Sequence, residues 1–226
     1  MLRRAMLSCW CFQAPCCRSL SSSSAALRVP PLYSEAKLSR FGWEWVDSKS
    51  SDENWLDLAY MLSRNSVAID GHMGCCIVKG KDVLVESRNH GLYEEFRSDV
   101  HAEASAICAA AKDGVSLRNS TLYVTRAPCA RCYKLIAETG IEKVVAPTAM
   151  ETKEREHAAN RGLTYLVIKD NADRKQWRDA IAEPFRDQNN IDTLRMQRKI
   201  QKENFKRGKR NKRDARMMTP LNNETT

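Results

Sequence analysis

Short apolar stretches alternate with helix-forming stretches through the middle of this chain of 226 residues. Apolar residues at helical spacing predict a first helix at 52–64, with Ser51 or Asp52 as its N-cap. Two short strands follow at 74–79 and 82–87, and the intervening Gly80-Lys81 indicates a hairpin. Three more strands then alternate with helices. The strands are predicted at 121–125, 143–146 and 164–169, and the helices at 101–113, 128–139, 150–161 and 172–183.

This order predicts an α/β fold. Strands separated by helices are joined by right-handed crossovers and lie parallel, whereas the hairpin is antiparallel. We therefore expect a five-stranded mixed sheet, with helices on both faces and the last two strands parallel. One domain over 51–186 accounts for these elements, and no internal repeat is present.

The ends of the chain are the basic parts. Residues 1–28 hold four Arg and no acidic residue, with a serine run at 21–24. This composition is typical of an organellar transit peptide, and we expect it to direct the protein to the mitochondrion rather than to a plastid or the nucleus. The tail at 187–226, predicted to be helical or disordered, carries eleven Lys or Arg and two acids between Arg195 and Arg216. The net charge of +9 therefore describes the ends and not the domain.

Residues 29–50 form an arm that includes Phe41-Gly42-Trp43-Glu44-Trp45. Its aromatic rings suit either packing on the domain, which we favour, or stacking against bases. No apolar run approaches the length of a membrane span, so no membrane partner is expected. The nine cysteines lack the density of a secreted disulfide scaffold, which indicates a reducing compartment.

Two motifs carry the chemistry. His101-Ala102-Glu103 opens one predicted helix, and Pro128-Cys129-Ala130-Arg131-Cys132 opens another directly after a strand. Imidazole and thiolate are ligands that zinc accepts, and a catalytic zinc site uses three protein ligands with water in the fourth position. Cys129 and Cys132 lie in one turn, where the helix N-terminus favours thiolates. His101 would complete the set, and Pro128 suits the first helical position.

Other readings of these motifs are weaker. A structural four-cysteine site would need a second pair, but Cys75 and Cys76 are adjacent in a strand and point to opposite faces. A redox role for the two motif cysteines leaves His101 and Glu103 unexplained. Cys75, Cys76 and Cys108 have apolar neighbours and are interpreted as small core residues.

With these motifs, residues 52–170 resemble the zinc-dependent cytidine/deoxycytidylate deaminase superfamily. The resemblance implies a three-layer cytidine-deaminase-like fold, one catalytic Zn²⁺ held by His101, Cys129 and Cys132, and Glu103 as the proton shuttle. It also implies that Asn89 binds substrate, although an ordinary turn residue is the alternative. Members of the superfamily commonly form oligomers, so a homo- or hetero-oligomer is expected.

The sequence fits more than one class of substrate. The stretch from Cys132 to Ile136 resembles deoxycytidylate deaminases, which predicts a nucleotide or nucleobase substrate containing cytosine. The sequence departs from them at Ser87-Arg88-Asn89-His90 and at Ser105, and the short step from Asn89 to His101 resembles the nucleobase and tRNA branches. The tRNA branch usually has Met where this chain has Arg131.

Two other functions are therefore considered as alternatives to the deamination of a free nucleotide. The first is an editing enzyme that deaminates adenosine or cytidine in tRNA and contacts the RNA through the tail from Arg195 to Arg216. The second is an inactive, zinc-stabilised RNA-binding or partner subunit. Inactive partners typically lose the catalytic Glu, and Glu103 is present here.

Overall fold

The structure is a computed structural model that describes residues 37–94, 96–185 and 188–217, without the side chains of 188–195 and 212–217. Chain contacts divide the protein into two units, Met1–Glu35 and Ala36–Thr226, and every described residue belongs to the second. The transit peptide predicted at 1–28 lies outside the described residues.

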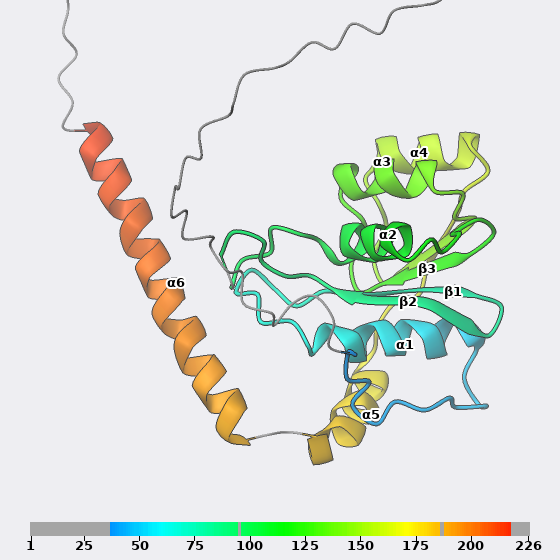
Figure 1. Cartoon of the computed structure of the whole chain (residues 1–226), viewed down its shortest axis with the longest axis horizontal. Coiled ribbons are helices and arrows are strands. Elements are labelled where there is room, and N and C mark those ends of the chain that lie inside the picture. Colours follow the sequence, from blue (N-terminus) through cyan, green and yellow to red (C-terminus); the bar gives the residue numbers. More distant parts are fainter. Residues whose placement is uncertain (1–36, 95, 186–187, 218–226) are drawn as a thin grey trace, which may run out of the picture. The chain divides into compact units, whose positions relative to one another are not determined.

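The elements follow the predicted order (Figure 1). The strands are β1 (Gly74–Lys79), β2 (Asp82–Arg88), β3 (Thr121–Val124), β4 (Lys143–Ala146) and β5 (Thr164–Val167). The helices of the domain are α1 (Ser51–Ser63), α2 (Ala102–Lys112), α3 (Ala130–Glu138), α4 (Thr152–Asn160) and α5 (Ala172–Ala182). A short 3-10 turn, η2 (Glu183–Phe185), follows α5, and a long helix, α6 (Gln188–Met217), occupies the basic tail.

The five strands form one sheet in the order β2-β1-β3-β4-β5. β1 pairs antiparallel with both β2 and β3, whereas β3, β4 and β5 are parallel to one another. The predicted mixed sheet with parallel last strands is therefore confirmed. The parallel strands bring the loops at their carboxyl ends to one edge of the sheet, and this edge holds the candidate site.

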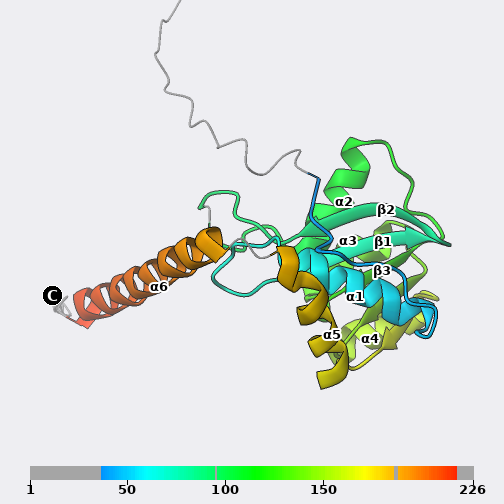
Figure 2. The same cartoon turned by 90° about the horizontal axis from the view of Figure 1, so that it is seen from below.

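Helices cover both faces of the sheet. α2, α3 and α4 lie on one face and α1 and α5 on the other, which Figure 2 shows from below with α1 and α5 in front of the sheet. Each interface has its own apolar core. Cys75 belongs to the core beneath α2, and Cys76 belongs to the core beneath α1, so the neighbouring cysteines do point to opposite faces.

The first helix begins one residue earlier than predicted. Its N-cap is Ser50, whose hydroxyl accepts a hydrogen bond from the Glu53 backbone while the Glu53 carboxylate accepts one from the Ser50 backbone. The predicted N-cap at Ser51 or Asp52 was wrong because this reciprocal pair forms a capping box with a three-residue spacing. Asp52 instead accepts hydrogen bonds from Tyr123 and Lys143.

The described part of the aromatic arm packs on α1. Trp43 stacks on Trp55 with 5.6 Å between ring centroids, and Trp45 meets the same ring edge-on at 5.1 Å. Trp55 is 5% exposed, so the arm completes the burial of an α1 side chain. The rings of Trp43 and Trp45 therefore pack on the domain.

A buried charge cluster joins α1 to α5. The Asp57 carboxylate is completely buried and accepts from Lys49 Nζ at 2.9 Å, Arg174 Nη2 at 2.8 Å and Arg178 Nη1 at 2.6 Å. Arg178 also donates to Asp170 at 2.7 Å. Charges taken out of water need such partners, so this cluster holds α5 in one position against α1.

Among the described residues, no helix has the length and apolar character that crossing a membrane requires. α6 is the longest helix, with 30 residues, and its sequence is strongly polar.

Candidate metal centre

Two helix N-termini meet at the candidate site. His101 is the N-cap residue of α2, and Cys129 is the N-cap residue of α3. Neither side chain caps its own helix by a hydrogen bond, so both are free to point toward a shared ligand. Cys132, three residues into the first turn, is buried and faces the same point. α3 begins at Ala130, so Pro128 precedes the N-cap and does not occupy the first helical position as predicted.

The three predicted ligands lie at the distances a metal requires. His101 Nδ1 is 3.6 Å from Cys129 Sγ and 3.5 Å from Cys132 Sγ, and all three ligand atoms lie within 4.8 Å of one another. For tetrahedral zinc with typical Zn–N and Zn–S bond lengths, the N···S edge is about 3.5 Å. The donor set and its spacing therefore fit a zinc ion with one position left for another ligand.

The electrostatics of the site also favour a cation. Burial raises the pKa of the Cys132 thiol, and the neighbouring Glu103 and Cys129 raise it further. A bound divalent cation reverses this effect, because a coordinating thiol is deprotonated outright. The positive ends of α2 and α3 both lie at the site and add to the stabilisation of thiolate. These three residues form the one cluster of possible metal ligands in the described part of the chain.

Glu103 lies beside this cluster in the first turn of α2. Its side chain is 5% exposed, and burial raises the pKa of the carboxyl above its usual value. A buried carboxyl with a raised pKa in a cavity has the properties of a general acid and base. Glu103 also lies near His101 in space, because His101 is the N-cap of α2 and Glu103 lies in the first turn of the same helix.

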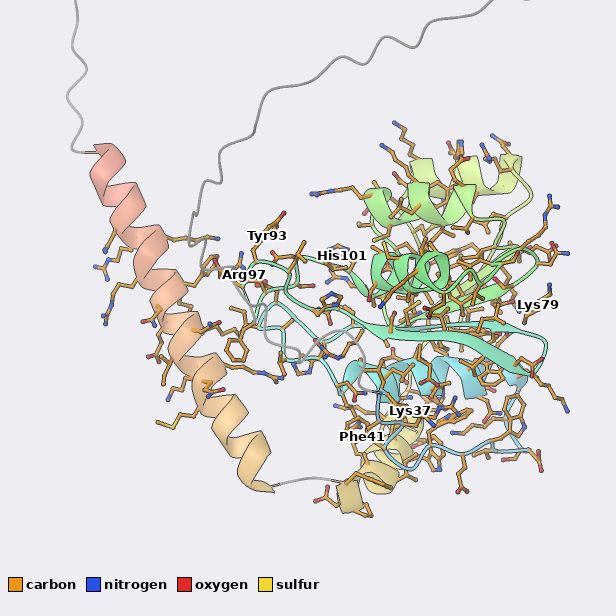
Figure 3. The ribbon with its side chains drawn as sticks, viewed as in Figure 1. Lys37, Phe41, Lys79, Tyr93, Arg97 and His101 are labelled. Atoms are coloured by element: carbon orange, nitrogen blue, oxygen red, sulfur yellow. The ribbon has the colours of Figure 1, made fainter. Side chains whose placement is uncertain are left out.

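A cavity of about 770 Å³ opens over the metal ligands. This volume suits a small ligand such as a nucleotide. Figure 3 places His101 at the end of the domain opposite Lys79, which lies at the β1–β2 turn. The polar lining includes the predicted His101, Cys129, Glu103 and Asn89, and it adds Asp70, Ser98, Arg126, Thr148 and Glu151.

Asn89 lines this cavity, but its amide is engaged by the protein. Its Oδ1 accepts from the Met73 backbone at 2.9 Å, and its Nδ2 donates to Gly71 O and to Ser98 Oγ, each at 2.8 Å. The residue is 1% exposed. In the structure Asn89 thus holds three segments of the cavity wall together, and its contact with substrate stays a prediction.

Sequence reasoning did not identify Arg126 as a site residue. This exposed cation follows β3 and lines the cavity just before the cysteine motif. Its position in the sequence, between a buried strand and Pro128, could have identified it, because loops at the carboxyl ends of parallel strands form binding sites. Arg131, in contrast, is exposed on α3 and does not line the cavity.

Cys108 was wrongly predicted to be a core residue, because it is exposed. The buried positions of α2 include Ala102, Ala106 and Ala110, which repeat every four residues. Cys108 lies two positions from Ala106, about 200° around the helix, and therefore faces outward. Apolar neighbours in the sequence were a poor guide because they did not respect the helical period.

Comparisons with known proteins agree with this geometry. Residues 49–148 match the family described as the cytidine and deoxycytidylate deaminase zinc-binding region. The deoxycytidylate deaminase of Enterobacteria phage T2 is 36% identical over 103 residues, which cover 44% of this chain and 53% of the relative. The deoxycytidylate deaminase of Enterobacteria phage T4 is 35% identical over 100 residues, covering 42% and 50%. The chain thus spans about half the length of these curated relatives.

A solved structure is also similar. The dCMP deaminase of cyanophage S-TIM5, in its apo form, aligns with a TM-score of 0.47 and 26% identity. The alignment covers 52% of this chain and 96% of the phage protein.

Proposed function

We propose that this chain, whose residues 49–148 belong to the cytidine and deoxycytidylate deaminase superfamily, catalyses the hydrolytic deamination of a cytosine nucleotide such as deoxycytidylate. The observation that carries the proposal is the triangle of His101, Cys129 and Cys132 beside the buried carboxyl of Glu103. The names of the phage T2 and T4 relatives support deoxycytidylate as the substrate.

His101, Cys129 and Cys132 would hold the zinc ion. When bound, zinc supplies Lewis acidity that lowers the pKa of water toward neutrality. The chain's own contribution is geometric. Two rigid helix starts fix the three ligands before the metal arrives, and this arrangement leaves one coordination position facing the cavity.

Glu103 would move the protons of the reaction. Its carboxylate accepts a proton from the attacking water as the new bond from oxygen to C4 of the base forms. The carboxyl would pass this proton to ring N3, which receives the electron pair of the C4=N3 double bond. It would then take the second proton from the new hydroxyl group and donate it to the amino group at C4, so that the C–N bond breaks, ammonia leaves and a uracil ring remains. Burial of Glu103 supports proton uptake, because it raises the pKa of the carboxyl and so makes the carboxylate a better proton acceptor.

The cavity wall offers partners for the rest of a nucleotide. Arg126 is an exposed cation that lines the cavity, and its guanidinium suits a 5′-phosphate. Asn89 and Ser98 line the same cavity and are hydrogen-bonded to each other, so Asn89 would reach the sugar or the base by exchanging one of its protein partners for the substrate. The tertiary position of Asn89 is consistent with the role that the family resemblance implies for it.

A panel of substrates tests the proposal. Purified protein loaded with zinc is incubated with dCMP, CMP, deoxycytidine, cytosine and adenosine, and the release of ammonia is measured. We expect the fastest release from dCMP. Arg126→Gln should raise KM for dCMP by about tenfold or more while changing the reaction of deoxycytidine little, because deoxycytidine has no phosphate. Absence of ammonia from every cytosine compound would refute the function.

Two other predictions from the sequence remain proposals. We propose that residues 1–28 direct the protein to mitochondria, because this segment is rich in Arg and Ser and lacks acids. Fusion of this segment to a fluorescent protein tests the targeting.

We also propose that the protein assembles into an oligomer, as the family resemblance implies, and light scattering on the purified protein measures its mass.

A further inference from the structure

A second cavity, of about 600 Å³, lies between α6 and the loop that precedes β1. The loop contributes Ala68, Ile69, Gly71 and His72. The α6 side is strongly basic, and it consists of Arg198, Lys199, Lys202, Glu203 and Lys206. We call this cavity the basic groove. Four cations against one acid give its α6 wall a clear positive charge.

The cations of α6 are gathered on one side of the helix. At 100° per residue, all the Lys and Arg between 196 and 211 fall within about half of the helix circumference. The other side carries uncharged residues such as Gln197, Gln201, Asn204 and Asn211. The cationic side lines the basic groove. Arg198, Lys202 and Lys206 recur every four residues, so they form a ladder with a rise of about 6 Å per step.

Specific contacts hold this side of α6 against the domain. Arg198 Nη2 donates to the Ser66 backbone oxygen at 2.8 Å. The Arg97 guanidinium of the domain lies 4.6 Å from the centroid of the Phe205 ring of α6. The groove thus has two walls that contact each other at defined residues.

The basic groove adjoins the candidate metal centre. Gly71 lines both cavities, and its carbonyl accepts a hydrogen bond from Asn89, which lines the catalytic cavity. The loop that leads to His101 carries Tyr93, which is 88% exposed and shares this end of the domain with Arg97 and His101 (Figure 3). The Asp99 carboxylate accepts hydrogen bonds from the Leu92 and Tyr93 backbones, which positions the backbone of Tyr93.

We propose that the basic groove binds the phosphate backbone of a single-stranded nucleic acid and presents one of its cytosines to the catalytic cavity. The groove offers a regular row of cations, and the loop whose Arg97 contacts Phe205 of α6 carries the exposed ring of Tyr93. Single strands require both features, because phosphates need charge and bases stack on aromatic rings. A mononucleotide brings its phosphate with its base and leaves most of this row unused. The presentation of a cytosine rests on the proposed function, whereas binding in the groove does not.

Binding to labelled oligonucleotides tests the groove. Full-length protein is titrated against fluorescent 12-residue oligo(rC) and oligo(dC), and anisotropy is recorded over a range of salt concentrations. Lys202→Glu with Lys206→Glu should weaken binding by about tenfold or more near physiological salt. It should also reduce the slope of log affinity against log salt by about 1.4, since each phosphate contact on a single strand contributes about 0.7.

A matched control separates position from total charge. Lys153→Glu with Lys175→Glu makes the same change in net charge at exposed positions on α4 and α5. This control should keep oligonucleotide affinity within about twofold of the wild type. Equal losses in the two double variants would overturn the proposal, as would no measurable binding by the wild-type protein. Melting temperatures of both variants verify that each is folded.

Three further arms identify the ligand and separate the two proposals. Inorganic polyphosphate should bind more weakly than the oligonucleotides, and Tyr93→Ala should weaken only the oligonucleotides, by at least about fivefold. Equal affinity for polyphosphate with no effect of Tyr93→Ala would reject a nucleic acid as the ligand. The ratio of oligo(rC) to oligo(dC) affinity distinguishes RNA from DNA. Deamination of dCMP without oligonucleotide binding would refute the groove alone, whereas binding without deamination of either substrate would refute only the enzyme and the presentation of cytosine.

Discussion

The two faces of the sheet bury their charged groups in opposite ways. On the face covered by α1 and α5, the Asp57 carboxylate is surrounded by Lys49, Arg174 and Arg178. On the face covered by α2 and α3, the Glu103 carboxyl is 5% exposed, and within the described residues no Lys or Arg forms an ion pair with it. One face compensates its buried charge, and the other leaves it available.

The paired carboxylate of Asp57 suits a role in stability, whereas the carboxyl of Glu103 suits a role in the reaction. A carboxylate that is fully paired has a fixed charge and a fixed position, so it suits the attachment of one helix to another. A carboxyl that is buried without a Lys or Arg partner has a raised pKa and can exchange protons, as Glu103 would in the proposed reaction. Substitutions on the two faces should therefore affect different measurements.

The largest expected effect comes from removing a metal ligand. Cys132→Ala should lower bound zinc to background, because two ligands hold zinc far less tightly than three. Deamination should fall by about 10⁴-fold or more, since activation of water depends on the metal. Metal analysis and ammonia release measure the two effects. Cys108→Ala, which changes an exposed cysteine on α2, should leave both unchanged.

Removal of the metal from the unaltered protein extends this test. Dialysis against a chelator should abolish deamination, and added zinc should restore it. Full activity in protein shown to be free of metal would contradict the assignment of His101, Cys129 and Cys132 as ligands.

The second effect isolates the proton carrier from the metal. Glu103→Gln keeps the size of the side chain but cannot accept a proton, so kcat should fall by about 10² to 10⁴-fold. Zinc content should remain at the wild-type level, because Glu103 is not one of the three ligands. A variant that retained normal kcat would remove Glu103 from the reaction.

The third effect belongs to the opposite face. Asp57→Ala should lower the free energy of unfolding by about 3–5 kcal/mol, because it leaves Arg174 and Arg178 buried without their shared carboxylate. Urea denaturation measures the change. Zinc content in the folded protein should be unaffected. The exposed Asp47 provides the control, and Asp47→Ala should change the free energy of unfolding by less than about 0.5 kcal/mol.

The smallest effect tests the start of α1. Ser50→Ala should lower the free energy of unfolding by about 1 kcal/mol, because it removes the side chain that caps the helix. Ser51→Ala replaces the residue first expected to act as the cap and should have a smaller effect. The reverse order of the two losses, measured by urea denaturation, would contradict the capping box at Ser50 and Glu53.

Local patterns were sufficient for the elements and for the metal ligands. The period of apolar residues placed every helix and strand of the domain to within about two residues of its observed ends. The His-x-Glu and Cys-x-x-Cys spacings named the three residues that the structure brings together. Such motifs are readable because each lies within one helical turn, where the backbone itself sets the relation between side chains.

Patterns failed where a side chain's partner is distant in the chain. The residues around Asn89 gave no sign that its amide would join Gly71, Met73 and Ser98 into one wall. Cys108 has apolar neighbours in the sequence and yet faces outward on α2. Neither the pairing of Asp57 with Arg174 and Arg178 nor the capping of α1 by Ser50 was anticipated.

The amino-acid sequence alone decided the order of strands and helices, the identity of the metal donors and the position of the carboxylate beside them, because these depend on short-range backbone geometry and on side-chain chemistry. Tertiary structure alone decided which buried carboxylate has Lys and Arg partners and which has none among the described residues. It also decided that Arg126 lines the cavity over the metal ligands and that α6 turns its cations toward the loop at Gly71. The physical reason is that these contacts join residues more than a hundred positions apart in the sequence. Only the packing of the helices on the sheet brings such residues together and removes their charges from water.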